Sequence, residues 1–200
     1  MHKFLSALPL CVLTLFSLGS VAPAAADSTE PAPAVVAKVE HNGSLVVVDV
    51  TMHVRLPLPV VWEVLTDFEH MTQFIPNLER SEVTRREDRS LTVKQRGHAD
   101  YAGFSFGYES EREVLLEPQA RINSRTLSGN LAGARSQSQL TVLPGEVLVT
   151  YHAESEPKVW LPPVIGPAAI RSQTELQFRA MLAEMERRSA ARGVAQKEQP

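Results

Sequence analysis

The first regular pattern of apolar and polar residues runs from Leu45 to Leu56, where the sequence reads LVVVDVTMHVRL. Apolar side chains alternate with polar ones in its second half, and one side of an extended chain would carry Val46, Val48, Val50, Met52 and Val54. A period of two residues is typical of a strand with one buried face. The pattern therefore predicts a first strand over 45–56.

Helical spacing replaces this alternation directly afterwards. Pro59 suits the first turn of a helix. Apolar residues then recur three and four positions apart, at Val61, Val64, Leu65 and Phe68. Thr66 and Glu69 have the spacing of a capping box, which would end one helix and start another, and Pro76 must end the second. The pattern predicts two short helices joined by a bend.

Six further segments with strand-like composition follow, separated by turns that contain Gly, Pro, Asp or Ser. Their predicted ranges are 78–86, 90–98, 104–116, 121–127, 134–143 and 146–155. Because the connections between them are short, neighbouring strands should run antiparallel. The first of the six is dense in charge, which is typical of a strand at the edge of a sheet.

The longest helical pattern lies near the carboxy end, over 167–188. One stripe along it consists of Ile170, Thr174, Phe178, Met181, Leu182 and Met185. A stripe of this length needs a broad apolar partner, and a sheet built from the strands is the only candidate. The sequence therefore predicts an α+β fold, in which a seven-stranded antiparallel curved sheet surrounds a long carboxy-terminal helix.

The amino-terminal residues 1–26 have the pattern of a secretory signal peptide. Lys3 precedes an apolar run, and Ala-Pro-Ala-Ala-Ala stands before Asp27. An uncleaved membrane anchor is the alternative, but the small residues before Asp27 favour cleavage. We therefore expect a protein that is exported to the periplasm and loses Cys11, its only cysteine, with the signal.

Composition divides the rest of the chain into three parts. Residues 27–43 begin with a Pro- and Ala-rich stretch that has little to bury, so they are predicted to be a flexible leader. Residues 44–188 are predicted to form one ligand-binding domain, and residues 189–200 a frayed polar tail.

Charge and motifs exclude several classes of function. The formal net charge is -3 at pH 7, and acidic and basic residues are intermixed, unlike the basic patches of nucleic-acid-binding proteins. The histidines lack metal-ligand spacing, and the sequence contains no phosphate-binding loop. Neither a metal nor a cofactor is predicted, and the oligomeric state is left open.

Two segments carry a resemblance to a known family. They are VWEVLTDFEHMTQFIPNL after the first strand and EPKVWLPPVIGP before the last helix. With the order of elements, they resemble the START-like (SRPBCC) superfamily, and within it the coenzyme-Q-binding and polyketide-cyclase-like group. The resemblance implies a helix-grip fold with a cavity between sheet and helix. It also implies that Trp62, Phe68, Phe74 and Ile75 help to seal one end of that cavity.

The predicted ligand-binding residues follow from strand parity, from the helix stripe and from this resemblance. They are Trp62, Phe74, Phe106, Tyr108, Arg112, Ser136, Tyr151, Trp160, Ile165, Ile170, Thr174 and Phe178. The same parity turns several small or polar residues inward: Gln95, Ser124, Thr126, Ser136 and Ser138. Such a lining is typical of a small-molecule site. Alternatively, a bulge reverses the parity and these residues face water.

Three segments leave alternatives open. Arg112 would hold a carboxylate, phosphate or quinone oxygen if it points inward, or would pair with Glu109 or Glu111 at the rim. Residues 98–101 could transfer protons or could form an exposed polar turn. Residues 160–167 could be a lid that touches a membrane transiently, or a stiff connector that covers the core.

These observations favour an exported carrier of a hydrophobic small molecule, such as a lipid, an isoprenoid quinone or a polyketide-like compound. Apolar area removed from water would supply most of the affinity. The alternatives are a cyclase or dehydratase that uses Tyr108, Tyr151 or residues 98–101, and a protein-interaction module with an incidental cavity.

Overall fold

The computed structural model describes residues 34–156 and 166–197, which belong to one compact unit that runs from Pro33 to Pro200. Its strands are β1 (Val35–Asn42), β2 (Leu45–Val54), β3 (Leu78–Arg86), β4 (Ser90–Tyr101), β5 (Phe104–Glu117), β6 (Arg121–Gly129), β7 (Arg135–Leu143) and β8 (Glu146–Ser155). Its helices are α1 (Leu58–Thr66), the short 3-10 helix η1 (Met71–Gln73) and α2 (Gly166–Lys197).

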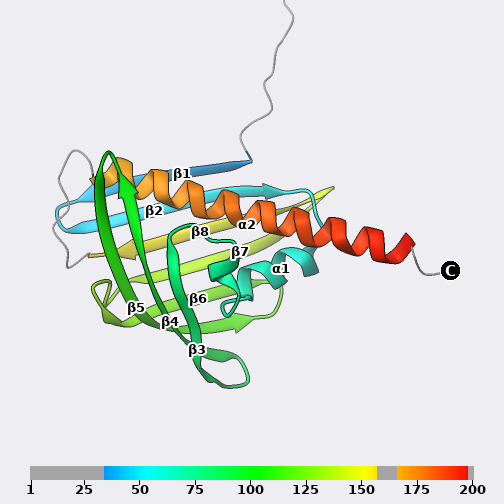
Figure 1. Ribbon diagram of the computed structural model, residues 1–200, viewed down its shortest axis with the longest axis horizontal. Helices are drawn as coiled ribbons and strands as arrows, with labels where there is room; N and C mark the ends of the chain where they lie inside the picture. The colour runs from blue at the N-terminus through cyan, green and yellow to red at the C-terminus, as the bar shows by residue number, and fades with distance from the viewer. Residues whose placement is uncertain (1–33, 157–165, 198–200) are drawn as a thin grey trace, which may run out of the picture. The chain divides into compact units, whose positions relative to one another are not determined.

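The strands form one antiparallel sheet in the order β1-β2-β8-β7-β6-β5-β4-β3. Figure 1 shows α2 lying across one face of this curved sheet, with α1 beside it. The α+β helix-grip fold predicted from the sequence is confirmed. The charge-dense strand β3 lies at an edge, as predicted, and two register shifts interrupt its pairing with β4.

The sheet has eight strands rather than the seven predicted, because the leader contributes one. Residues 35–42 form β1, so the prediction of a flexible leader over 27–43 is wrong for these residues. Val35 and Ala37 point into the core, and β1 pairs with β2 through a tight turn at Gly43, where φ is 66°. The Pro- and Ala-rich composition before β1 concealed this alternation.

The last helix is also longer than predicted. It continues from residue 188 to Lys197, so most of the predicted polar tail is helical. Arg192, within this extension, forms an ion pair with Glu63 of α1, which anchors the added turn. The predicted signal peptide, the start of the leader and residues 157–165 lie outside the described residues.

The apolar core fills only part of the space between the sheet and the helices. The predicted stripe of β2 is buried in full, and Val147 and Val149 of β8 lie next to it. Phe178 and Met185 of α2, with Val61 and Val64 of α1, cover this half of the sheet. On β6 and β7 the inward residues are mostly small and hydroxylated, so α2 has much less to pack against there.

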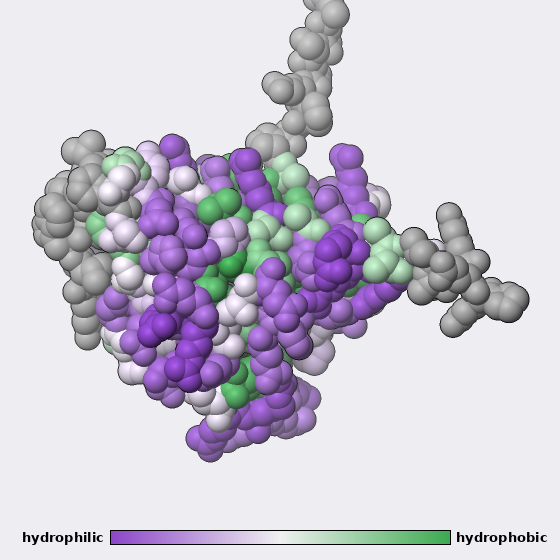
Figure 2. Space-filling view, viewed as in Figure 1, coloured by the Kyte–Doolittle hydropathy of each residue, from purple (hydrophilic) through white to green (hydrophobic). Residues whose placement is uncertain are grey.

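The surface in the same view is mostly hydrophilic, and apolar residues show near its middle, where α2 crosses the sheet (Figure 2). Within the described residues, no helix combines the length and the apolar character that crossing a membrane requires.

Two adjacent valines test whether β1 belongs to the core. Val35 is 3% exposed and Val36 is 38% exposed. Val35→Ala should lower the free energy of unfolding by about 2 kcal/mol, because it removes buried methyl groups and leaves a cavity. Val36→Ala, with the same change in strand propensity, should cost less than about 0.5 kcal/mol. Urea unfolding measures the free energy of unfolding of both variants. Equal small effects would show that residues 35–42 behave as the flexible leader predicted from the sequence.

Candidate functional site

Two adjoining hollows lie between the sheet and α2. The inner hollow, lined at one end by Leu65, Phe68 and Met71, has a volume of about 140 Å³. The outer hollow, which extends to the β6–β7 turn and to Ile170, has a volume of about 320 Å³. One water occupies about 30 Å³ of liquid, so the interior is not packed solid. The larger volume lies at the lower end of the range of small-molecule sites.

The side chains shared by both hollows come from five strands and from α2. They are Gln95, Tyr108, Arg112, Ser124, Ser136, Tyr151 and Gln177. The predicted inward parity of the small and polar residues is therefore correct: Ser138 lines the inner hollow and Thr126 the outer one. A register shift does occur on β6, but it falls at Leu127, beyond the lining residues, and leaves Leu127 48% exposed.

Arg112 points into the hollows from β5. Its Cζ lies 5.6 Å from the centroid of the Phe68 ring. Its Nε is shielded from water and has no hydrogen-bond partner, and within the described part of the chain no carboxylate forms an ion pair with this guanidinium. Burial lowers the pKa of Arg112, and the two nearby tyrosines offset this only in part.

The predicted alternative, in which Arg112 pairs with a rim glutamate, is wrong. Glu109 lies 3.8 Å from Lys94 Nζ. Glu111 accepts a hydrogen bond of 3.3 Å from Ser128 Oγ. Both carboxylates therefore sit on the outer face of the sheet, and neither pairs with Arg112.

Two phenols stand close to Arg112. Tyr108 is hydrogen-bonded to Gln177, and Tyr151 to Ser136. Burial raises the pKa of both tyrosines, even though Arg112 favours their ionised forms. Both phenols are therefore protonated at neutral pH. The ring of Tyr151 also packs against that of Phe178, with 5.3 Å between the centroids.

Gly97 on β4 lets Tyr108 take this position. A Cβ atom at Gly97 would lie 2.7 Å from the Tyr108 hydroxyl oxygen and would also collide with the backbone oxygen of Asn77. Gly97 and Tyr108 are register partners on β4 and β5. The ring of Tyr108 therefore occupies space that any other residue at position 97 would fill.

Hydrogen bonds hold Phe68 beneath Arg112. Ser81 Oγ donates to the backbone oxygen of Phe68 at 2.5 Å. Gln95 Nε2 in turn donates to Ser81 Oγ at 2.9 Å. These buried hydrogen bonds tie the bend between the two short helices to β3 and β4, so the position of Phe68 beneath the guanidinium is fixed.

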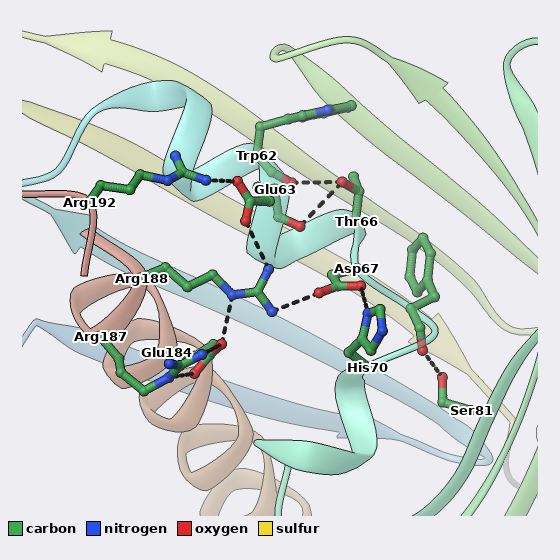
Figure 3. Close-up of polar contacts among 11 residues, drawn as sticks. Trp62, Glu63, Thr66, Asp67, His70, Ser81, Glu184, Arg187, Arg188 and Arg192 are labelled. Atoms are coloured by element: carbon green, nitrogen blue, oxygen red, sulfur yellow. Dashed lines mark hydrogen bonds and ion pairs between the residues drawn. The ribbon is translucent and has the colours of Figure 1, made fainter. Parts of the chain in front are cut away.

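An ion network joins α2 to α1 and to the residue after it (Figure 3). Arg188 of α2 reaches Asp67 at 2.6 Å, Glu184 at 2.6 Å and Glu63 at 3.1 Å. Its Cζ also lies 5.7 Å from the centroid of the Phe74 ring. Because all its partners lie on α1, on α2 or just after α1, this one guanidinium fixes the two helices to each other.

The structure brings together eight of the twelve predicted ligand-binding residues. Tyr108, Arg112, Ser136, Tyr151 and Phe178 line the inner hollow, and Phe106, Ile170 and Thr174 line the outer one. Trp62 and Phe74 are not among the lining residues, and they pack half-buried against the core instead. Trp160 and Ile165 lie outside the described residues.

Trp62 and Phe74 do not line the end of the cavity that they were predicted to seal, and helical phase explains this for Trp62. Phe68 and Ile75, named with them, do line the inner hollow. Trp62 follows the buried Val61 on α1, so it lies about a quarter turn away from the inward stripe. Sequence reasoning also missed Gln173 and Gln177, although a helical spacing of four residues places both beside the predicted stripe.

The other candidate groups do not face the hollows. His98 lies on the outer side of β4, between Glu79 at 3.1 Å and Asp100 at 3.2 Å. Of residues 98–101, only Ala99 lines a hollow. His53 and His152 are exposed, as the parity of their strands indicates. In the described ranges no three His, Cys, Asp or Glu side chains come together as metal ligands.

A family model described as polyketide cyclase / dehydrase and lipid transport matches residues 46–190. The chain belongs to this family. Its members' description covers both enzymes and carriers, so the family and the fold indicate either hydrophobic-ligand binding or a polyketide-cyclase type of function. A search of curated proteins found no match.

Solved structures share the fold at low sequence identity. A STAR-related lipid transfer protein from Xanthomonas axonopodis has a TM-score of 0.63 and 14% identity over 78% of this chain and 95% of its own. The Zhui aromatase/cyclase from Streptomyces sp. R1128 has a TM-score of 0.58 and 20% identity over 72% and 95%. A START superfamily protein from Mycobacterium smegmatis has a TM-score of 0.57 and 16% identity over 70% and 97%.

The ion network predicts a loss of stability in acid. Hydrogen bonds from Arg187, and then from Arg188, lower the pKa of Glu184 from 4.5 to about 2. A lowered folded-state pKa stabilises the protein above pH 4.5, and this contribution is lost as the pH falls towards 2. The free energy of unfolding should therefore fall in this window, and less steeply in Glu184→Gln.

Urea unfolding at a series of pH values measures this slope. Glu186→Gln changes an exposed glutamate of the same helix and should keep the wild-type slope. A slope that is the same in both variants would show that Glu184 does not carry the effect.

Proposed function

We propose that this protein is an exported carrier that holds one hydrophobic small molecule in the two hollows between the sheet and α2. The single observation that supports binding is an interior with room, lined by apolar side chains and by a few polar groups that point inward. Removal of the ligand's apolar surface from water would supply most of the affinity.

The chemistry of the lining favours a carrier over an enzyme. Catalysis by proton transfer needs a group that accepts a proton near neutral pH. Among the described residues that line the hollows, no histidine or cysteine is present, and burial raises the pKa of both tyrosines. The one carboxylate, that of Glu154, belongs to an exposed residue and lies 3.6 Å from His152 Nε2.

A cyclase or dehydratase remains the second candidate, because Arg112 and two protonated phenols converge on one space. Such an arrangement can stabilise negative charge on a substrate oxygen. An enzyme would convert its ligand, and a carrier would release it unchanged, so product analysis after incubation separates the two.

Export rests on the sequence pattern of residues 1–26. Amino-terminal sequencing of the protein purified from its own host should find a mature chain that begins near Asp27. If the purified protein instead begins at Met1, the proposal that it is exported with cleavage of residues 1–26 is contradicted. Transient membrane contact through residues 160–167 remains a prediction.

A matched pair of substitutions on β7 tests binding in the hollows. Ser136 lines both hollows, and its neighbour Gln137 faces the other side of the sheet. Ser136→Phe should weaken binding of the neutral dye N-phenylnaphthylamine by about tenfold or more, because the new ring fills the space that the dye needs. Gln137→Phe should bind the dye as the wild type does.

Dye fluorescence titration measures both affinities, and circular dichroism checks that both variants fold. Equal dye binding by Ser136→Phe and the wild type would place the dye elsewhere and contradict the proposal.

A further inference from the structure

Two residues that line the outer hollow each carry a hydrogen-bond donor without a partner. Arg112 lines it from the sheet, and Gln173 lines it from α2. Arg112 Nε and Gln173 Nε2 are shielded from water and have no hydrogen-bond partner, and Gln173 is only 9% exposed as a residue. Two side chains with an unpartnered donor therefore border the same space.

Unpartnered buried donors destabilise a folded protein, because they lose their hydrogen bonds to water and gain none in return. A ligand bound by apolar contact alone would be served better by leucine or methionine at these positions. Such groups are rare in native proteins and need an explanation, and a bound ligand that accepts from them supplies one.

The charge around Arg112 points the same way. The inner hollow has no carboxylate among its described lining residues. At the outer hollow, Arg135 and Glu154 are register partners on the exposed face of β7 and β8, so their charges offset each other. The positive charge of Arg112 is left uncompensated, with two protonated phenols beside it.

An alcohol, a ketone or a quinone oxygen would satisfy a donor but leave this charge unbalanced. A carboxylate would do both, because its two oxygens can accept from one guanidinium in parallel. It carries one negative charge, which one guanidinium balances, whereas a doubly ionised phosphate would bring an excess charge into the hollow.

We propose that the carried molecule is an amphiphile with an ionised carboxylate, which pairs with Arg112, and with an oxygen acceptor within reach of Gln173. This inference rests on the proposed function and narrows it from hydrophobic compounds in general to acidic ones. The apolar part then occupies the space lined by Phe106, Ile170 and Thr174 or the inner hollow.

Displacement of the neutral dye N-phenylnaphthylamine tests the preference for an acid. Decanoate and decanol share one chain and differ in charge, so the ratio of their dissociation constants isolates the head group. At neutral pH the wild type should bind decanoate about tenfold more tightly than decanol. Arg112→Met should remove the preference, and Arg112→Lys should retain part of it because the charge remains.

The outcomes separate the two proposals. Equal affinity of the wild type for decanoate and decanol would contradict the proposed carboxylate on the ligand, but not the proposed carrier function. Tighter binding of decyl phosphate than of decanoate would show that the site prefers another anion, and would also contradict the proposed carboxylate. Failure of the dye and of all three amphiphiles to bind contradicts the carrier itself.

Thermal stability without ligand gives a second readout. Because Arg112→Met exchanges an uncompensated buried charge for an apolar chain of similar length, it should raise Tm. Arg125→Met is the matched control, since Arg125 is exposed on β6 and lies 3.3 Å from Glu113, and it should leave Tm nearly unchanged. A Tm for ligand-free Arg112→Met below that of the wild type would show that Arg112 is structural and overturn the inference.

Discussion

A guanidinium that faces the interior without a carboxylate is the constraint around which this molecule is arranged. Arg112 cannot be covered by α2 as an apolar residue would be, so the neighbouring strands present small hydroxylated side chains and leave space. Phe68 lies under the charge, and hydrogen bonds through Ser81 and Gln95 keep it there. The hollow is therefore built on fixed elements and does not arise from poor packing.

Arg188 shows that the same chain can satisfy a shielded guanidinium when only stability requires it. Three carboxylates, from Glu63, Asp67 and Glu184, surround Arg188 at the far end of α2 (Figure 3). That network joins α1 to α2. Arg112 differs in its surroundings: carboxylates of the protein pair with Arg188, whereas Arg112 borders two hollows and pairs with none.

The pattern of apolar and polar residues predicted most of the fold, because period-two and helical spacing depend only on local sequence. It also placed Arg112 and Tyr108 on the inward face of β5, since β5 pairs with β4 without a register shift and the extra residue of the shift between β5 and β6 lies on β6, at Leu127. It failed for β1, because the Pro- and Ala-rich residues before this strand were given more weight than the alternation of Val35, Ala37 and Val39. The tight turn at Gly43, which allows β1 to pair with β2, was the signal that the sequence analysis missed.

The errors within the site have a common cause. Trp62 and Phe74 were chosen as large aromatics, but neither lines the hollow, in the case of Trp62 because of helical phase, whereas Gln173 and Gln177 were passed over as polar. A residue's type does not decide whether it lines a cavity, because a cavity that binds a polar head needs polar donors. That Arg112 lacks a partner could not be predicted, since it depends on where every nearby carboxylate points.

Native mass spectrometry of the protein purified from its own host, followed by solvent extraction, tests the central claim most directly. The account predicts one bound amphiphile per chain that carries a carboxylate and is detected as an anion after extraction. A bound molecule that is neutral, with no acidic group to meet Arg112, would contradict it.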